Sequence, residues 1–445
     1  MIDVKHMLLV ASFIFAIGIN GCNNRDTTLE INTTGTILPE ISSEQKSIKS
    51  KVKVVQLQAI TPALKNINDN YESSYIVNAN NNLTSQIVNK KTDEDKTATI
   101  LEDISSQYSN LNSTITVAQL KAIAPALSNI NDDYQDIYRS YIASTDINIS
   151  SPATVDEVQS MINEVNDLNL PEHAILDRSF FKKTNGIFEH RFVYLPVTNS
   201  TTGKTWLNNN LGADYANVDS SDYNPSQQAM TVNDRKASGS AFQWGRKADG
   251  HELMDWTPFT IPDIHDPRDT PRTYYGKGKY GETKTPADEP SHSLFILSQY
   301  DIARYDWRVN HDDTLWAGES SPNNVCPIGY RLPLSPNAGD DAPADDGKNE
   351  WYVEMSTWSS QDRAGSFASE LKLSVAGNRS EWHGYVFARH VEEVYWAGTE
   401  YNITKYEIEM RKHGSSIWID IDNDDVDANN NSRKANGNAV RCIKD

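Results

Sequence analysis

The chain has 445 residues and a formal net charge of −20, and this length predicts about three domains. The acidic balance argues against nucleic acid as a partner, because phosphate binding depends on clustered lysine and arginine. It favours instead a soluble protein whose negatively charged surface repels other copies of the same chain. After residue 19, no segment is apolar for long enough to span a membrane as a helix.

Residues 1–21 are predicted to be a lipoprotein signal peptide. Lys5 precedes the apolar run Met7–Ile19, which is shorter than the about 20 residues of a spanning helix and typical of a secretory leader. The alternative is a buried core helix, but a polar, unpatterned stretch follows the run. Ile19-Asn20-Gly21-Cys22 resembles the bacterial lipobox, although Asn20 is unusual there. We therefore expect Cys22 to carry lipid, with residues 22–50 as a flexible tether, and to anchor the protein in the cell envelope, at the outer membrane or cell surface.

The other two cysteines are far apart in sequence. Export places them in an oxidising compartment, where disulfides persist. If Cys22 carries lipid, only Cys326 and Cys442 remain. We therefore predict a Cys326–Cys442 disulfide, and the alternative is two unrelated buried thiols.

An internal repeat occupies the first half of the chain. VVQLQAITPALKNINDNY at residues 54–71 returns as VAQLKAIAPALSNINDDY at residues 117–134. We predict two small three-helix bundles, over residues 51–110 and 111–170, with the third helix of the first copy around residues 99–108. Both resemble the tandem three-helix modules of bacterial surface proteins and adhesins, some of which bind host proteins. The simpler alternative is a spacer, since the apolar stripes are the bundle's own core.

The second copy shows its helix boundaries clearly. Thr116 with Gln119 and Thr154 with Glu157 form capping boxes at the starts of two helices. Pro125 is unfavourable for continuing the first of them. Between these helices, Asn131 precedes a third one. The predicted apolar stripes are Tyr134, Ile137, Tyr138, Tyr141 and Ile142, and then Val158, Met161, Ile162 and Val165.

The second half, residues 171–445, carries an ordered set of motifs. They are TGKTWLNNNLGA (202–213), SAFQWGRKADGHE (240–252), YDWRVNHDDTLWAG (305–318), NNVCPIGYRLP (323–333), STWSSQDRAGSFASELKLSVAGNRS (356–380), VYWAGTE (394–400) and GNAVRCIKD (437–445). Together, from about Arg191 onward, they resemble the Fibrobacter succinogenes major paralogous domain of secreted and lipid-anchored bacterial proteins. One departure is Asn208-Asn209, where the family usually has an Asp-Arg pair, so that ion pair is absent.

The resemblance implies a loop-rich α+β fold like that of C-type lectins and formylglycine-generating enzymes. It also implies that the cysteines of the VRC and CPIGYRLP motifs are bonded. Independently, the alternation of Ile417, Ile419 and Ile421 predicts a strand, and residues 439–443 are predicted to be a terminal strand. Prolines interrupt any helix in residues 253–290, at Pro258, Pro262, Pro267, Pro271, Pro286 and Pro290.

The sequence offers no catalytic constellation, so we predict a non-enzyme. Formylglycine-generating enzymes use paired cysteine thiols, and only Cys442 has a comparable position. His251-Glu252 has no second histidine to complete a zinc-protease motif, and no nucleophile elbow is present. Oxidation of the formylglycine-generating type is therefore a distant alternative.

We predict no cofactor except a candidate calcium site. Trp418-Ile419-Asp420 and Glu289-Pro290-Ser291 lack the amide ligands typical of calcium-dependent lectins. A separate acidic run offers oxygen ligands that suit calcium, from Asp420, Asp422, Asp424, Asp425 and Asp427. It lacks the glycine and glutamate positions of an EF-hand loop, and its alternative is a solvated acidic loop or strand edge.

The expected function is recognition, through a ligand-binding site whose residues the sequence does not identify. All ten tryptophans lie between Trp206 and Trp418, and aromatic faces can stack on sugars. However, Trp244, Trp396 and Trp418 lie in predicted strands, where such rings are more often core. We expect binding of glycan or protein through loops in residues 256–292, where a site would be an aromatic, polar-rimmed cleft. The alternative is a purely structural envelope or stalk protein without a ligand.

Overall fold

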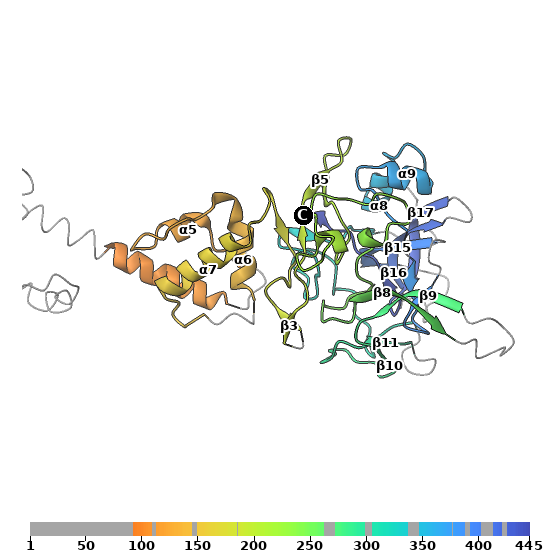
Figure 1. Cartoon of the computed structure of the whole chain (residues 1–445), viewed down its shortest axis with the longest axis horizontal. Coiled ribbons are helices and arrows are strands. Elements are labelled where there is room, and N and C mark those ends of the chain that lie inside the picture. Colours follow the sequence, from red (N-terminus) through yellow and green to blue (C-terminus); the bar gives the residue numbers. More distant parts are fainter. Residues whose placement is uncertain are drawn as a thin grey trace, which may run out of the picture. The chain divides into compact units, whose positions relative to one another are not determined.

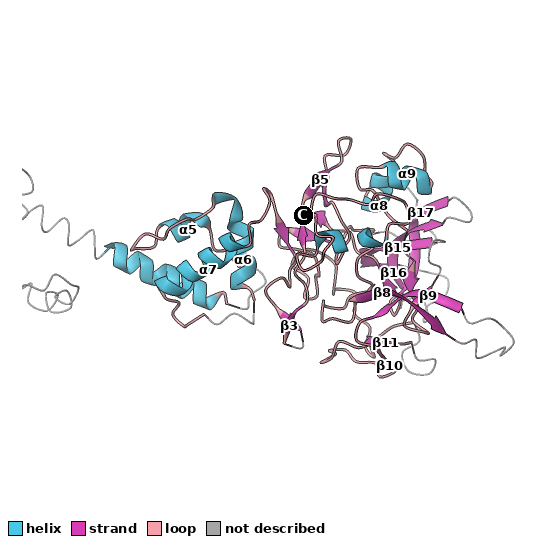
Figure 2. Cartoon of the chain, in the orientation of Figure 1, coloured by secondary structure: helices cyan, strands magenta, loops and turns pink. Residues whose placement is uncertain are grey.

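The computed structural model describes residues 92–108, 113–144, 149–184, 186–261, 272–298, 305–336, 347–375, 377–387, 392–401, 413–420 and 425–445. The chain divides into two compact units, Met1–Asp95 and Lys96–Asp445. Cys22, the tether and most of the first repeat lie outside the described residues. The second unit is a mixed α+β fold, in which helices come first and many small, mostly antiparallel sheets follow (Figure 2). Within these ranges, no helix has both the length and the hydropathy needed to cross a bilayer.

The helices of the second repeat begin where the sequence predicts. In the first repeat, the helix expected around residues 99–108 covers residues 92–106 of the described chain. In the second repeat, the elements are α5 (Val117–Lys121), the 3-10 turn η2 (Asp132–Tyr134), α6 (Gln135–Ile142) and α7 (Val155–Asp167). Both capping boxes are present, because the Thr116 and Thr154 hydroxyls accept from the backbone N–H groups of Gln119 and Glu157. The Glu157 carboxylate accepts from Ser150 and Thr154, and these bonds lower its pKa to about 2. All nine residues of the two predicted stripes are buried.

The core of these helices includes residues on both sides of the boundaries expected at 110 and 170. Ile100 and Ile104, which the sequence assigns to the first repeat, pack with the stripes of α5, α6 and α7. Leu176, Phe180 and Val193, which we assign to the C-terminal domain, join the same core. The physical reason is the small size of α5, which has only five residues. Additional apolar groups are needed to cover α6 and α7.

Most of the described strands have only two or three residues, and loops connect them (Figure 1). Two sheets have four strands each. In the first, the strand order is β12 (Tyr330–Arg331), β19 (Ile443–Lys444), β6 (Thr205–Leu207) and β5 (Pro196–Thr198). In the second, it is β14 (Val386–Phe387), β13 (Asn378–Arg379), β18 (Gly437–Asn438) and β7 (Phe242–Gln243). A three-stranded sheet contains β15 (Glu392–Glu400), β16 (His413–Asp420) and β17 (Asp425–Arg433). The two-stranded pairs are β1 (Ile175–Leu176) with β4 (Val193–Tyr194), β2 (Lys183–Thr184) with β3 (Ile187–Phe188), β8 (Met254–Ile261) with β9 (Arg272–Gly278), and the parallel β10 (Glu282–Thr283) with β11 (Phe295–Ile296). Among the described residues, the unit also has four short helices, η3 (Asp214–Ala216), η4 (Arg235–Ala237), α8 (Glu350–Met355) and α9 (Arg363–Ala368).

The sheet of β15, β16 and β17 carries much of the core. Ile417 and Ile419 share a buried cluster with Tyr395, as their alternation predicts, whereas Ile421 lies outside the described residues. Trp244 and Trp396 are fully buried, as expected of core rings, whereas Trp418 is only half-buried. At Gly414 a side chain is excluded, because a Cβ atom there would lie 2.3 Å from Cδ1 of Trp244.

The predicted terminal strand at residues 439–443 is instead divided between two sheets. Ala439 exchanges backbone hydrogen bonds with Val394 and Trp396 of the β15 segment. The carbonyls of Val440 and Cys442 then accept from N–H groups at Leu211 and Leu207. Because each neighbour pairs with only part of this segment, the segment forms no continuous ladder and joins the two sheets instead.

Candidate functional site

Cys326 and Cys442 form the disulfide that the sequence analysis expects. Their sulfur atoms are 2.05 Å apart, across 116 residues of sequence, and both side chains are fully buried. The Arg178 guanidinium donates to the Cys326 carbonyl oxygen. The bond therefore connects the loop before β12 to the end of the chain, and its role is to hold the loop-rich region together.

The acidic run forms part of a strand edge in the residues that the structure describes. Asp420 ends β16 and pairs with Asp425, which begins β17. Asp425 and Asp427 are exposed, whereas the intervening Val426 is buried. The Asp425 and Asp427 carboxylates accept hydrogen bonds from nearby backbone N–H groups. Asp422 and Asp424 lie outside the described residues, and no group of three metal-capable side chains in the described part of the chain includes Asp420, Asp425 or Asp427.

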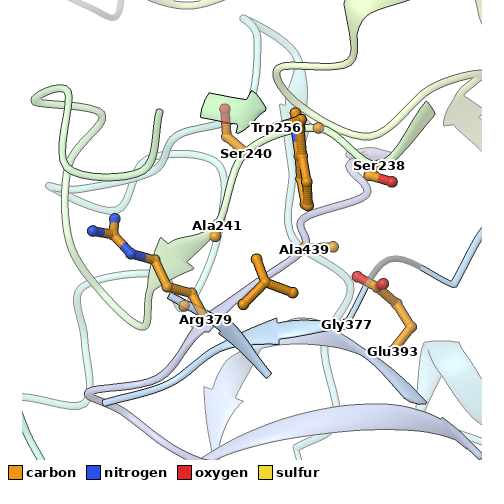
Figure 3. Close-up of a pocket in the computed structure, with 11 residues that line it drawn as sticks. Ser238, Ser240, Ala241, Trp256, Gly377, Arg379, Glu393 and Ala439 are labelled. Carbon is orange, nitrogen blue, oxygen red and sulfur yellow. The ribbon is translucent and has the colours of Figure 1, made fainter. Parts of the chain in front are cut away.

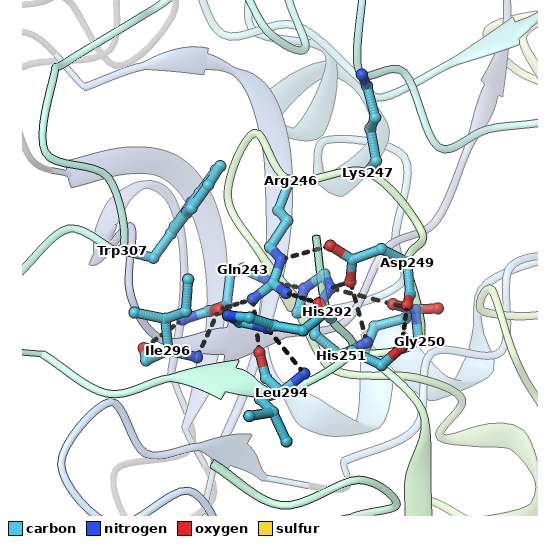
Figure 4. A network of polar contacts seen from close by, with 12 residues as sticks. Gln243, Arg246, Lys247, Asp249, Gly250, His251, His292, Leu294, Ile296 and Trp307 are labelled. Carbon is cyan, nitrogen blue, oxygen red and sulfur yellow. Dashed lines mark hydrogen bonds and ion pairs between the residues drawn. The ribbon is translucent and has the colours of Figure 1, made fainter. Parts of the chain in front are cut away.

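Another cluster of polar side chains includes His251 and Glu252 (Figure 4). This is the dipeptide that lacks the second histidine of a zinc-protease motif. His251 Nδ1 lies 2.7 Å from Asp249 Oδ1 and 3.1 Å from Glu252 Oε2. The Gln243 backbone N–H donates to His251 Nε2 at 3.1 Å. His251 Nε2 therefore accepts a hydrogen bond, while Nδ1 faces the two carboxylates. Both ring nitrogens are engaged, so a metal ion could bind either one only by displacing a buried hydrogen bond.

Charged groups around this histidine are paired inside the protein. His190 Nε2 lies 2.6 Å from Glu252 Oε1. Burial alone would raise the pKa of Glu252, but hydrogen bonds from His190 and His251 lower it far below its ordinary value. Arg246 donates to Asp249 and Gln243, and to the carbonyls of His292 and Leu294 (Figure 4). Through the His292 and Leu294 carbonyls, these pairings anchor the loop before β11.

A small cavity lies beside Trp256, at the start of the segment expected to bind a ligand (Figure 3). Arg379, Glu393, Ser238 and Ser240 contribute to its lining. Its volume of about 10 Å³ is enough for about one water molecule. The Trp256 ring packs against Gly276, where a Cβ atom would lie 2.9 Å from the indole. The cavity is therefore too small for a sugar or a peptide, and it is not the aromatic cleft expected from the sequence.

The same segment does present aromatic rings at the surface. We define the β8–β9 aromatic surface as Phe259, Tyr274, His383 and Tyr385. Phe259 and Tyr274 are cross-strand partners whose ring centroids are 6.0 Å apart. Tyr385 lies 4.6 Å from Tyr274 and 5.2 Å from His383 between centroids. Phe259, Tyr274 and Tyr385 are half-buried, and His383 is exposed.

Polar groups border this surface. Lys277 Nζ lies 5.7 Å from the centroid of Phe259 and 3.9 Å from Asp255 Oδ2. A backbone bridge between Lys277 and Tyr385 brings β14 beside β9. The sequence analysis names residues 256–292 but misses His383 and Tyr385. No local signal could have found them, because this bridge joins residues that are far apart in the chain.

Asn208 and Asn209, which stand at the expected Asp-Arg positions, form neutral hydrogen bonds. The Asn208 and Asn209 side-chain amides donate at 2.7 Å to the carbonyls of Pro225 and Gln227, respectively. Amide contacts to the backbone therefore hold this loop in place of an ion pair.

Comparison with known proteins adds no functional assignment. No protein-family model, curated protein or solved structure matches the chain.

Proposed function

We propose that the chain is a cell-envelope lipoprotein with a non-catalytic recognition module, and that this module binds glycan through the β8–β9 aromatic surface. Cys22 would carry the lipid, and two three-helix bundles would space a C-type-lectin-like domain of the Fibrobacter succinogenes major paralogous type from the membrane. The supporting observation is the contiguous cluster of Phe259, Tyr274 and Tyr385 within reach of solvent.

The chemistry of this surface suits a sugar. The apolar face of a pyranose can stack on an aromatic ring, while its hydroxyl groups need hydrogen-bonding partners at the edge. Lys277, Asp255 and the tyrosine hydroxyls provide donors and acceptors there. Aromatic residues also dominate binding energy in interfaces where they are held in place by packing. Here Phe259, Tyr274 and Tyr385 pack against one another.

A purely structural envelope role is the second candidate. It is favoured by the burial of Trp206, Trp244, Trp307, Trp316 and Trp396, whose rings form core rather than surface. In this case the domain would end a stalk without binding any ligand, and the β8–β9 aromatic surface would only stabilise its hairpin.

The lipid anchor predicts a simple fractionation result. Cys22→Ser should remove the attachment atom, so the protein should leave the membrane fraction and no longer incorporate labelled fatty acid. Wild-type protein should retain both properties after washing with high salt, because two or more acyl chains anchor stably. Finding wild-type protein in the cytosol with its leader uncut would contradict export.

The glycan proposal predicts loss of binding on ring removal. In the mature chain, Tyr274→Ala and Tyr385→Ala should each weaken binding to an array-identified glycan by about tenfold or more, the equivalent of about 1.4 kcal/mol. Titration calorimetry would measure the affinity, and thermal unfolding would verify the fold. Phe188→Ala is the matched control, because this ring is 38% exposed on a different hairpin, and it should leave binding unchanged.

Two results would contradict glycan binding at this surface. One is the absence of any ligand on a broad array. The other is a folded Tyr274→Ala/Tyr385→Ala double variant that binds as tightly as wild type. Capture of a defined envelope protein without glycan binding would show a protein-recognition module instead.

A further inference from the structure

A second aromatic cluster lies on the loop that carries His383 and Tyr385. Of the ten tryptophans, all of which lie within the described residues, only Trp382 is exposed, at 39%. Its ring centroid is 6.3 Å from that of Tyr305. The Arg433 guanidinium carbon lies 4.3 Å from the Tyr305 centroid and 6.0 Å from the Trp382 centroid. We call Trp382, Tyr305 and Arg433 the Trp382 cluster, and its three residue types are the ones most enriched at binding hot spots.

The loop at residues 380–385 holds the exposed tryptophan in a defined position. The Ser380 backbone N–H donates to the Tyr385 carbonyl at 3.0 Å, which closes the loop. The Ser380 hydroxyl accepts from the Trp382 backbone N–H at 3.2 Å and lies 3.2 Å from His383 Nδ1. These contacts order the backbone that carries the indole before any ligand binds. Such preorganisation reduces the entropic cost of binding.

Tyr305 has a strained backbone at this surface. Its φ angle is 68°, in the left-handed region that bulky residues rarely adopt. Its N–H donates to the Ser298 hydroxyl at 2.9 Å, and its carbonyl accepts from the Ala435 N–H at 3.0 Å. Strain of this kind persists only where the surrounding structure enforces it, and it is concentrated at functional sites. Here it places the phenol ring against Arg433 and Trp382.

The Trp382 cluster continues the β8–β9 aromatic surface. Trp382 directly precedes His383, which already belongs to that surface. Trp382 and Tyr385 are three residues apart, and three residues span at most about 11 Å even when fully extended. A ligand that lies on Tyr274 and Tyr385 therefore needs to extend only a short way to reach the exposed indole. A repeating chain can do so, whereas a single sugar would occupy one part of the surface.

We propose that the ligand of the β8–β9 aromatic surface is a glycan chain of several sugar units, and that the Trp382 cluster is a second subsite for the same chain. This inference rests on the proposed function. The indole would stack on the apolar face of one sugar. A guanidinium has five N–H donors, and the Arg433 side chain is 39% exposed, so it would donate to hydroxyl groups nearby. Two subsites on one chain strengthen binding, because the second contact forms within the complex.

The test is a length series on the mature chain. Oligomers of two, four and six units of the array-identified glycan would be titrated in a calorimeter. We expect the affinity of wild type to rise by about tenfold or more from the dimer to the hexamer. Trp382→Ala should remove most of this rise and leave the dimer affinity unchanged, with the fold verified by thermal unfolding. Met230→Ala is the matched control, because this side chain is 61% exposed in the loop before η4, and it should keep the full length dependence.

A measurement on the wild-type chain covers the case in which Trp382→Ala does not fold. The hexamer at saturation should protect Trp382 from oxidation by N-bromosuccinimide, as mapped by peptide mass spectrometry, whereas the saturating dimer should not. Equal oxidation of Trp382 with and without the hexamer would overturn the second subsite. So would a dimer that binds wild type as tightly as the hexamer, or a folded Trp382→Ala variant with the full length dependence. In these three cases glycan binding itself still stands, whereas no binding at any length would remove the proposed function together with this inference.

Discussion

Replacing both Cys326 and Cys442 with alanine is expected to lower the free energy of unfolding by about 4–5 kcal/mol in the chain-entropy account. The bond closes a loop with a sequence separation of 116 residues. Without it, the unfolded chain gains conformational freedom, while the folded region loses the covalent link between β12 and the end of the chain. Urea unfolding of the mature wild type and the double variant, monitored by tryptophan fluorescence, would measure the difference.

The chemical control is wild-type protein with reductant. Both sulfur atoms are inaccessible in the folded state, so reduction should be slow under native conditions and rapid in urea. After reduction in urea, the wild type should unfold like the double variant. Two alkylatable thiols in unreduced mature protein would show that the bond does not form. A stability loss below about 1 kcal/mol would show that strain or residual structure offsets the entropy gain.

Arg441→Met is expected to cost about 3 kcal/mol or more, because it removes the donor from four buried oxygen acceptors. Arg441 is 1% exposed. Its Nε donates to Asn210 Oδ1 at 2.8 Å, and Nη1 donates to three backbone carbonyls, at Leu207, Asn208 and Leu371. Methionine would replace the aliphatic part of the side chain but leave these oxygens unsatisfied, at about 1–3 kcal/mol for each buried group.

Thermal and urea unfolding would measure this effect against Arg235→Met. Arg235 is exposed on η4, and a surface substitution of this kind should change stability by no more than about 0.5 kcal/mol. An Arg441→Met variant within about 1 kcal/mol of wild type would mean that water or neighbouring donors satisfy the freed carbonyls. Burial lowers the pKa of Arg441 to about 10, so the guanidinium stays charged at neutral pH and the test needs no pH control.

Local features follow directly from residues close in sequence. The capping boxes at Thr116 and Thr154 depend on a side chain and a backbone N–H three residues apart, so the sequence alone predicts where α5 and α7 begin. The buried faces of α6 and α7 follow from helical periodicity in the same way. Alternation likewise places Ile417 and Ile419 on one buried face of β16. Each of these signals involves residues that lie close together in the sequence.

The sequence by itself therefore determined where α5 and α7 begin and which faces of α6, α7 and β16 are buried. Together with the expected export to an oxidising compartment, it also identified Cys326 and Cys442 as a disulfide pair. Only the tertiary structure decided which strands and loops meet. Residues 439–443 are divided between two sheets because each neighbour offers partners for only part of the segment. Tyr385 approaches Tyr274, and Trp382 approaches Tyr305, through contacts between distant segments. Such contacts depend on the packing of the whole unit, which leaves no periodic or local pattern in the chain.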